Sequence, residues 1–179
     1  MPIPFLDLKA PTAELRSALD AAHHRVADTG WFLIGPELEA FEREYASSVG
    51  VPFCIGVANG LEALQLILLA KGIGPGDEVI VPSNGYIATW LAVTHVGATP
   101  IPCEPDARTY NLDPNRLAPL ITRHTKAILP IHLYGQTADM SAINQIAATH
   151  NLIVVEDAAQ SHGARAHTRP SGSLGDRKS

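Results

Sequence analysis

The chain has 179 residues, of which 46% are hydrophobic, and it contains 14 glycines and 14 prolines. This length suits one ordinary domain with a core of its own, and the composition excludes the fibrous and the intrinsically disordered classes of protein. Because 13 basic residues face 18 acidic ones, the net charge is −5, which argues against nucleic acid as a partner.

The first predicted elements are two helices. Apolar residues repeat at helical spacing over residues 15–26. A second helix is predicted to begin at Pro36, a favoured residue in the first turn of a helix, and to stop near Gly50. We expect residues 1–35 to form an N-terminal helical segment and residues 36–179 to form part of a larger domain.

Beyond the second helix, strands and helices are expected to alternate. Short apolar runs predict strands at 53–57, 78–82, 99–103, 127–131 and 152–156. Helices are predicted between them at 61–71, 86–96, 113–122 and 138–150. The runs are apolar throughout, as is typical of parallel strands that are covered on both faces. The predicted fold class is therefore α/β, a mainly parallel open sheet with helices on both faces.

The residues just after each strand are the candidates for a site, because ligands of open parallel sheets bind outside the carboxyl ends of the strands. After the first predicted strand, Ala58, Asn59 and Gly60 open a helix. The free N–H groups of its first turn form a generic phosphate cradle, and a simple tight turn is the plainer interpretation. No G-x-G-x-x-G motif follows a strand, which counts against a dinucleotide oxidoreductase.

Two further side chains follow strands at the same edge. Tyr86 is either a ring that stacks on a planar ligand or an ordinary aromatic core residue. Asp157 is either the N-cap of the next turn or a partner for a protonated ring nitrogen. Pyridoxal phosphate requires such a partner, since a protonated pyridine is the better electron sink. The cradle, the aromatic ring and the carboxylate together favour that cofactor.

Histidines, cysteines and hydrophobic stretches indicate no metal, disulfide or membrane span. The eight histidines form no metal-ligand motif, and His132, after the fourth strand, is either a hydrogen-bonded structural residue or a contact to substrate. Cys54 and Cys103 are interpreted as buried thiols of a reducing compartment. The uncharged stretch 79–103 is interrupted by prolines, glycines and polar residues, and no signal peptide opens the chain. We expect a cytoplasmic protein with no membrane partner.

Five motifs occur in order at 56–60 (GVANG), 74–82 (GPGDEVIVP), 132–136 (HLYGQ), 156–160 (EDAAQ) and 172–176 (GSLGD). Together they resemble the DegT/DnrJ/EryC1/StrS family of sugar aminotransferases that depend on pyridoxal phosphate. The resemblance implies the large domain of the fold-type I, aspartate aminotransferase-like enzymes, truncated before the small C-terminal domain. It also implies pyridoxal 5'-phosphate as the cofactor and a homodimer for the full-length protein.

Within the family, the chain is most similar to the dTDP-3-amino-3,6-dideoxyhexose transaminases. The segments that carry this similarity are 59–64 (NGLEAL), 86–90 (YIATW) and 160–164 (QSHGA). The resemblance implies transfer of an amino group from glutamate to a nucleotide-linked 3-keto-6-deoxyhexose. Such a reaction belongs to the biosynthesis of amino-sugar polysaccharides or secondary metabolites.

The resemblance also implies roles for single residues. The implied cofactor-binding residues are Asn59, Gly60, Leu61, Tyr86, Asp157 and Gln160. Gly60 and Leu61 would give backbone N–H groups to the phosphate, and Tyr86 would stack on the pyridine ring. Of the two implied catalytic residues, Asp157 would pair with the ring nitrogen, and Gln160 would lie near the 3′ oxygen. The predicted substrate contacts are His132 and Tyr134.

Three positions depart from the family pattern. Leu61 and Gly85 stand where a threonine is common, which would loosen cofactor binding. The Schiff-base lysine, which follows the Gly-Asp pair in the family, has no counterpart among Lys9, Lys71, Lys126 and Lys178. We therefore expect the 179-residue chain alone to be inactive, because that lysine also shuttles the proton of transamination. The alternative is a truncated, non-catalytic protein that binds the cofactor or a nucleotide sugar.

Overall fold

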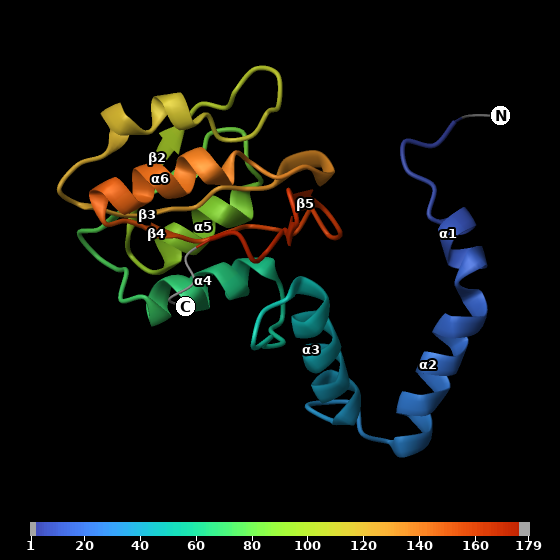
Figure 1. Ribbon diagram of the computed structural model, residues 1–179. Helices are drawn as coiled ribbons and strands as arrows, with labels where there is room; N and C mark the ends of the chain where they lie inside the picture. Colours follow the sequence, from blue (N-terminus) through green and yellow to red (C-terminus); the bar gives the residue numbers. More distant parts are fainter. Residues whose placement is uncertain (1–2, 176–179) are drawn as a thin grey trace. The chain divides into compact units, whose positions relative to one another are not determined.

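A computed structural model describes residues 3–175 and divides the chain into two units, Met1–Tyr45 and Ala46–Ser179 (Figure 1). The first unit holds α1 (Lys9–Glu14), α2 (Arg16–Thr29) and most of α3 (Pro36–Val49). Helix α2 ends at Gly30, whose left-handed backbone with φ of 65° closes the last turn. Neither α1 nor α2 has a buried residue.

The second unit is built on a parallel sheet of four strands. They are β1 (Glu78–Pro82), β2 (Thr99–Cys103), β3 (Thr125–Ile128) and β4 (Ile153–Val154), in the spatial order β2-β1-β3-β4. All three ladders are parallel. The chain steps from β1 to β2 on one side and returns to β3 on the other, so the order reverses between β1 and β3. Open α/β sheets bind ligands at such a switch point, outside the carboxyl ends of the strands.

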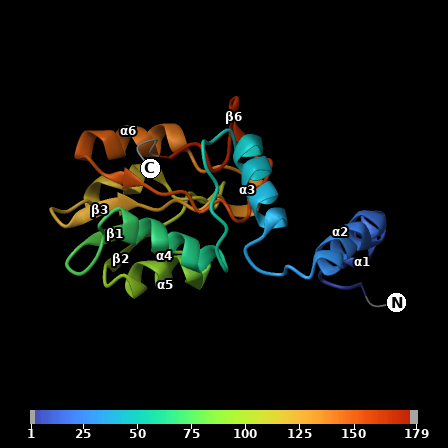
Figure 2. The same cartoon turned by 90° about the horizontal axis from the view of Figure 1, so that it is seen from below.

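Helices cover both faces of this sheet, as Figure 2 shows. Helices α4 (Gly60–Ala70) and α5 (Ile87–His95) lie on one face, and α6 (Met140–His150) lies on the other. One core packs Leu64 and Val93 of the helices against alternate strand residues such as Val81. The other packs Ile143 against the intervening strand residues, among them Ile80. Because helices cover both faces, four of the five residues of β1 and three of the four residues of β3 are buried, and the predicted α/β class is confirmed.

The strand predicted at 53–57 is wrong: no strand is assigned there within residues 3–175. A strand requires a hydrogen-bonding neighbour, and the ladders of the sheet join only β1 to β4. Phe53 and Ile55 are exposed instead. The strands predicted at 127–131 and 152–156 are present but shorter or shifted, and a single parallel bridge between Ile131 and Asp157 extends their pairing.

The helix predicted at 113–122 is also wrong. Two short 3-10 turns stand in its place, η1 (Pro114–Arg116) and η2 (Ala118–Leu120). Pro119 explains the difference, because a proline inside an α-helix removes one hydrogen bond and its ring clashes with the preceding turn. A small antiparallel hairpin of β5 (Arg165–Ala166) and β6 (Arg169–Pro170), which we did not predict, precedes the end of the described chain.

Neither cysteine forms a disulfide within the described residues. Cys103 is buried, and that burial raises the pKa of its thiol to about 11. Cys54 is only partly buried, which corrects the expectation of two buried thiols. A thiol held protonated at neutral pH is a poor nucleophile, so Cys103 is a packing residue. Within residues 3–175, no helix combines the length and the apolar character needed to cross a bilayer.

Candidate functional site

The carboxyl edge of the sheet brings five of the predicted site residues together. Tyr86 follows β1, His132 and Tyr134 follow β3, and Asp157 and Gln160 follow β4. Hydrogen bonds join the loops after β3 and β4 directly. The backbone N–H of His132 donates to the Asp157 carbonyl at 3.0 Å, and that of Tyr134 donates to Gln160 Oε1 at 3.2 Å.

Asp157 is half-buried, and both of its carboxylate oxygens are oriented by donors. The hydroxyl of Thr89, which is fully buried in α5, donates to Oδ2 at 2.9 Å. The backbone N–H of Ala159 donates to Oδ1 at 3.3 Å. The Asp157 backbone is itself fixed, since its N–H donates to the Pro130 carbonyl at 2.9 Å. Asp157 is therefore a pre-oriented acceptor at the rim of the sheet.

The start of α4 offers open backbone donors. Asn59 caps this helix by accepting the Glu62 N–H on Oδ1 at 2.9 Å, and Glu62 accepts the Ala58 N–H at 2.8 Å. Amides in the first turn of a helix have no partner inside the helix, and those of Gly60 and Leu61 belong to that turn. A Cβ added to Gly60 would meet nothing within 4 Å. The cradle can therefore be approached by a phosphate.

Tyr86 is 71% exposed and forms the N-cap of α5. This exposure excludes the interpretation as a core residue. Gly85 beside it brings the backbone close to Ile131, because an added Cβ would collide with the end of the Ile131 side chain. A threonine at this position would require Ile131 to move.

Gln160 links the β3 and β4 loops through both of its carbonyl groups. Its side-chain oxygen accepts the N–H of Tyr134, and its backbone oxygen accepts the N–H of Gly135 at 3.1 Å. Because the amide oxygen is used in this way, the amide nitrogen is the group that can donate to a ligand.

His132 is fully buried, and both of its ring nitrogens are hydrogen-bonded. Nδ1 accepts the Ala138 N–H at 3.1 Å, so the ring hydrogen lies on Nε2 and is donated to Glu156 Oε2 at 2.9 Å. This geometry supports the interpretation of His132 as a hydrogen-bonded structural residue, since neither ring nitrogen is left to contact a substrate.

Glu156 is a residue that the sequence reasoning missed, and its side chain is only 7% exposed. One carboxylate oxygen accepts the N–H groups of Leu174 and Gly175, and the other accepts those of Gly172 and His132 Nε2. Burial raises the pKa of this carboxyl, but the donors from His132, Gly175 and Gly172 outweigh burial and hold the pKa below its ordinary value. A signal was available in the sequence, because two carboxylates in a row after an apolar strand need donors.

The segment 172–175 has room only for glycine at its last position. A Cβ on Gly175 would lie 2.8 Å from the Val154 carbonyl and 3.2 Å from Glu156 Oε1. Glu156 therefore fastens this segment to the end of β4, next to Asp157. The remaining two residues of interest in this region, Asp176 and Lys178, lie outside the described residues.

We expect the contribution of Glu156 to stability to depend on pH. A carboxyl whose pKa is lowered on folding stabilises the native state above its ordinary pKa, here 4.5, and loses that contribution as the pH falls through the lowered value. The difference in unfolding free energy between the natural chain and Glu156→Gln should be constant above pH 4.5 and should narrow below it. Urea unfolding at a series of pH values measures this difference, and a gap that widens in acid would contradict the assignment.

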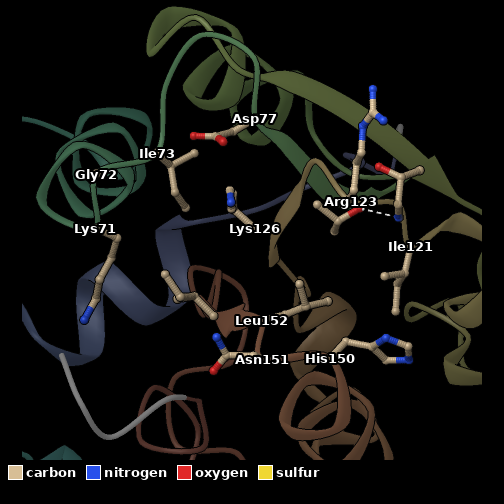
Figure 3. A pocket seen from close by; sticks show the side chains of 13 residues that line it. Lys71, Gly72, Ile73, Asp77, Ile121, Arg123, Lys126, His150, Asn151 and Leu152 are labelled. Atoms are coloured by element: carbon tan, nitrogen blue, oxygen red, sulfur yellow. Dashed lines mark hydrogen bonds between the residues drawn. The ribbon is translucent and has the colours of Figure 1, made fainter.

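A separate cavity of about 750 Å³ lies at the opposite edge, where the strands begin (Figure 3). Its basic lining residues are Lys71, Arg123, Lys126 and His150. None of the predicted site residues lies there. Lys71 and Lys126 are thus at the wrong edge to serve the Asp157 site, Lys9 belongs to the first unit, and Lys178 lies outside the described residues.

Comparisons of the sequence with known proteins all identify the same family. The model of the DegT/DnrJ/EryC1/StrS aminotransferase family matches residues 14–179. The chain is 53% identical to the dTDP-3-amino-3,6-dideoxy-alpha-D-galactopyranose transaminase of Aneurinibacillus thermoaerophilus, over 97% of the chain and 48% of that protein. It is 55% identical to the dTDP-3-amino-3,4,6-trideoxy-alpha-D-glucose transaminase of Streptomyces venezuelae, over 95% of the chain and 45% of that protein.

Solved structures agree in fold. The X-ray structure of S. venezuelae DesV superposes with a TM-score of 0.92 at 55% identity and covers 95% of the chain and 46% of DesV. A DegT/DnrJ/EryC1/StrS aminotransferase from Brucella abortus gives a TM-score of 0.90 at 36% identity, covering 97% of the chain and 48% of that protein. The chain spans about half the length of the curated relatives that it matches, 48% and 45% of the two named above.

Proposed function

Because the chain belongs to the DegT/DnrJ/EryC1/StrS aminotransferase family, we propose that its residues form the cofactor site of an aminotransferase for nucleotide-linked keto-deoxysugars. The observation that carries the proposal is Asp157, a carboxylate oriented by buried Thr89 at the same edge as the open start of α4. A carboxylate and a set of free amides at one edge suit a ligand with a cationic ring nitrogen and a phosphate.

Pyridoxal 5'-phosphate fits these residues. The phosphate would bind the N–H groups of Gly60 and Leu61, where the positive end of the α4 dipole favours an anion. Asn59 would hold the turn in shape by its cap. Tyr86, already exposed, would cover one face of the ring and exclude water from it.

When bound, the cofactor supplies an electron sink for the carbon atom that gains or loses the amino group. Asp157 would hold a proton on the ring nitrogen, and the Thr89 hydroxyl would keep the carboxylate pointing at it. Gln160 would donate from its amide nitrogen to the ring oxygen, since Tyr134 already occupies its amide oxygen. These residues would bind and orient the cofactor and hold a proton on its ring nitrogen.

The substrates in this proposal are glutamate as amino donor and a nucleotide-linked 3-keto-6-deoxyhexose as acceptor. Support comes from the two dTDP-3-amino-sugar transaminases that are 53% and 55% identical to the chain. A UDP-2-acetamido-2-deoxy-3-oxo-D-glucuronate aminotransferase of Pseudomonas aeruginosa, 49% identical over 90% of the chain and 45% of that protein, uses a related class of substrate by its name. The full-length protein would act as a cytoplasmic homodimer.

The second candidate is a non-catalytic protein that binds the cofactor or a nucleotide sugar. The observation in its favour is the place of the lysines, because Lys71 and Lys126 line the cavity at the opposite edge. Transamination needs a lysine beside the ring to form the covalent link and to move the proton.

One experiment tests both candidates. Residues 1–179 replace the matching segment of the S. venezuelae transaminase, and amine formation from glutamate and the dTDP-linked keto-sugar is followed by mass spectrometry. We expect this chimera to turn over. The 179-residue chain alone should bind pyridoxamine 5'-phosphate in calorimetry and form no amine. An inactive but folded chimera would reject the aminotransferase proposal, and turnover by the chain alone would reject the required role of a lysine outside it.

A further inference from the structure

Two exposed tyrosines stand beside the proposed cofactor site and have no role in it. Tyr110 is 55% exposed and Tyr134 is 69% exposed, so neither is buried for packing. Their ring centroids are 6.2 Å apart at an interplanar angle of 88°, an edge-to-face pair. Tyr110 lies in the loop after β2 and Tyr134 in the loop after β3, so the pair joins two loops of the carboxyl edge.

Both tyrosines have a left-handed backbone, with φ of 60° at Tyr110 and 59° at Tyr134. Such a conformation is uncommon for any residue with a large side chain, and it persists only where the surroundings enforce it. Two strained residues in contact at a sheet edge call for a functional explanation, because the packing of exposed rings contributes too little free energy to offset the backbone strain.

A network of side-chain amides enforces this backbone. Asn111 is 2% exposed, and its Oδ1 accepts the Leu133 N–H at 2.9 Å, which ties the two loops together next to both tyrosines. Gln136 donates to the Thr109 carbonyl at 2.8 Å. Asn84 donates to the Tyr110 carbonyl at 2.9 Å. The two rings are therefore presented on a rigid frame.

The pair adjoins the Asp157 site without overlapping it. The Tyr134 N–H is bound by Gln160, and the Tyr110 carbonyl is bound by Asn84, two residues before Tyr86. Arg108, an 89% exposed cation in the loop of Tyr110, has its Nε 3.8 Å from Asp106 Oδ1. An aromatic pair with an exposed guanidinium in the same loop suits a planar base that is followed by a diphosphate.

We propose that Tyr110 and Tyr134 form the subsite for the planar base of the nucleotide that carries the sugar. This inference rests on the proposed function, because only a nucleotide-linked substrate brings a base to this edge. It adds Tyr110 to the site and gives Tyr134 a defined partner. The rigid frame means that the rings are in place before the nucleotide arrives, which lowers the cost of binding.

The test uses the 179-residue chain with thymidine diphosphate as the probe in titration calorimetry. Tyr110→Leu and Tyr134→Leu should each weaken binding by about tenfold or more, since stacking on an aromatic ring contributes about 1–3 kcal/mol per base and 1.4 kcal/mol is tenfold. Tyr110→Phe and Tyr134→Phe keep the ring and should bind as the natural chain does. Phe53→Leu removes an exposed ring outside both loops and serves as the matched control.

Two further probes separate the possible failures. Inorganic pyrophosphate should bind the leucine variants and the natural chain alike, because it has no base. Pyridoxamine 5'-phosphate reports the cofactor site. If the natural chain does not bind pyridoxamine 5'-phosphate but still binds thymidine diphosphate in a way that depends on the two tyrosines, the proposed function is rejected and the base subsite is kept. No saturable binding of thymidine diphosphate, or leucine variants that fold and bind it as tightly as the natural chain, would overturn the inference.

Discussion

Asp157→Asn in the chimera with the S. venezuelae transaminase is expected to reduce turnover by about 100-fold or more, the range of a lost proton-holding group. Asparagine preserves the size of the side chain and can still accept the Thr89 hydroxyl. It is neutral, however, and cannot hold a proton on the ring nitrogen by its charge. The measurement is the steady-state rate of amine formation at saturating glutamate and keto-sugar nucleotide.

The comparison for this variant is His132→Gln in the same chimera. Glutamine keeps an N–H for Glu156, and the buried position of His132 places it away from substrate. Its loss of turnover should therefore be much smaller than that of Asp157→Asn. Equal losses in the two variants would show that Asp157 has been wrongly assigned as the partner of the ring nitrogen.

Glu156→Leu is expected to lower the free energy of unfolding of the 179-residue chain by about 3–5 kcal/mol, the cost of removing one partner from a buried charged network. Four donors would lose their acceptor: His132 Nε2 and the backbone N–H groups of Gly172, Leu174 and Gly175. Each unsatisfied donor costs free energy because it stays away from water. Urea unfolding followed by circular dichroism measures the change.

Glu104→Leu is the matched control for this variant, because Glu104 also follows a strand but is exposed. Its effect should stay within about 0.5 kcal/mol, as is usual for surface substitutions. If the two leucine variants unfold at the same urea concentration, the Glu156 network contributes nothing to stability and the interpretation of segment 172–175 is wrong.

The parts of the fold that the sequence predicts well are those decided by burial alone. β1 has the predicted bounds because its apolar run is covered on both faces, and β2 has them because it pairs with β1 along its whole length. The error at 53–57 has the opposite cause, since hydrophobicity identifies a segment that would suit a strand but not whether a neighbour exists to pair with it. At 113–122 the helix prediction relied on Pro114, a favoured first-turn residue, and gave no weight to Pro119, which disrupts a helix interior.

The residues of the candidate site also divide into those that the sequence predicts and those that it does not. Asp157 and the start of α4 were foreseeable, because they follow apolar runs directly in the sequence. Tyr110 was not, since its strained backbone depends on Asn84 and Asn111, which act from two loops at once. The donors to Glu156 lie 16 to 24 positions away from it in the sequence, at Gly172 and His132 respectively, and only the folded backbone brings them together.

The position of Lys71 and Lys126 has a consequence for covalent labelling. Aldehydes such as the cofactor react with any accessible amine, and borohydride then makes the attachment permanent. Among the described residues of the second unit, Lys71 and Lys126 line the cavity where the strands begin, at the opposite end of the sheet from Asp157. A labelled peptide recovered from such an experiment would map general amine reactivity, whereas the pyridoxamine form, which carries its own amine, forms no such link and would report only binding at the proposed Asp157 site.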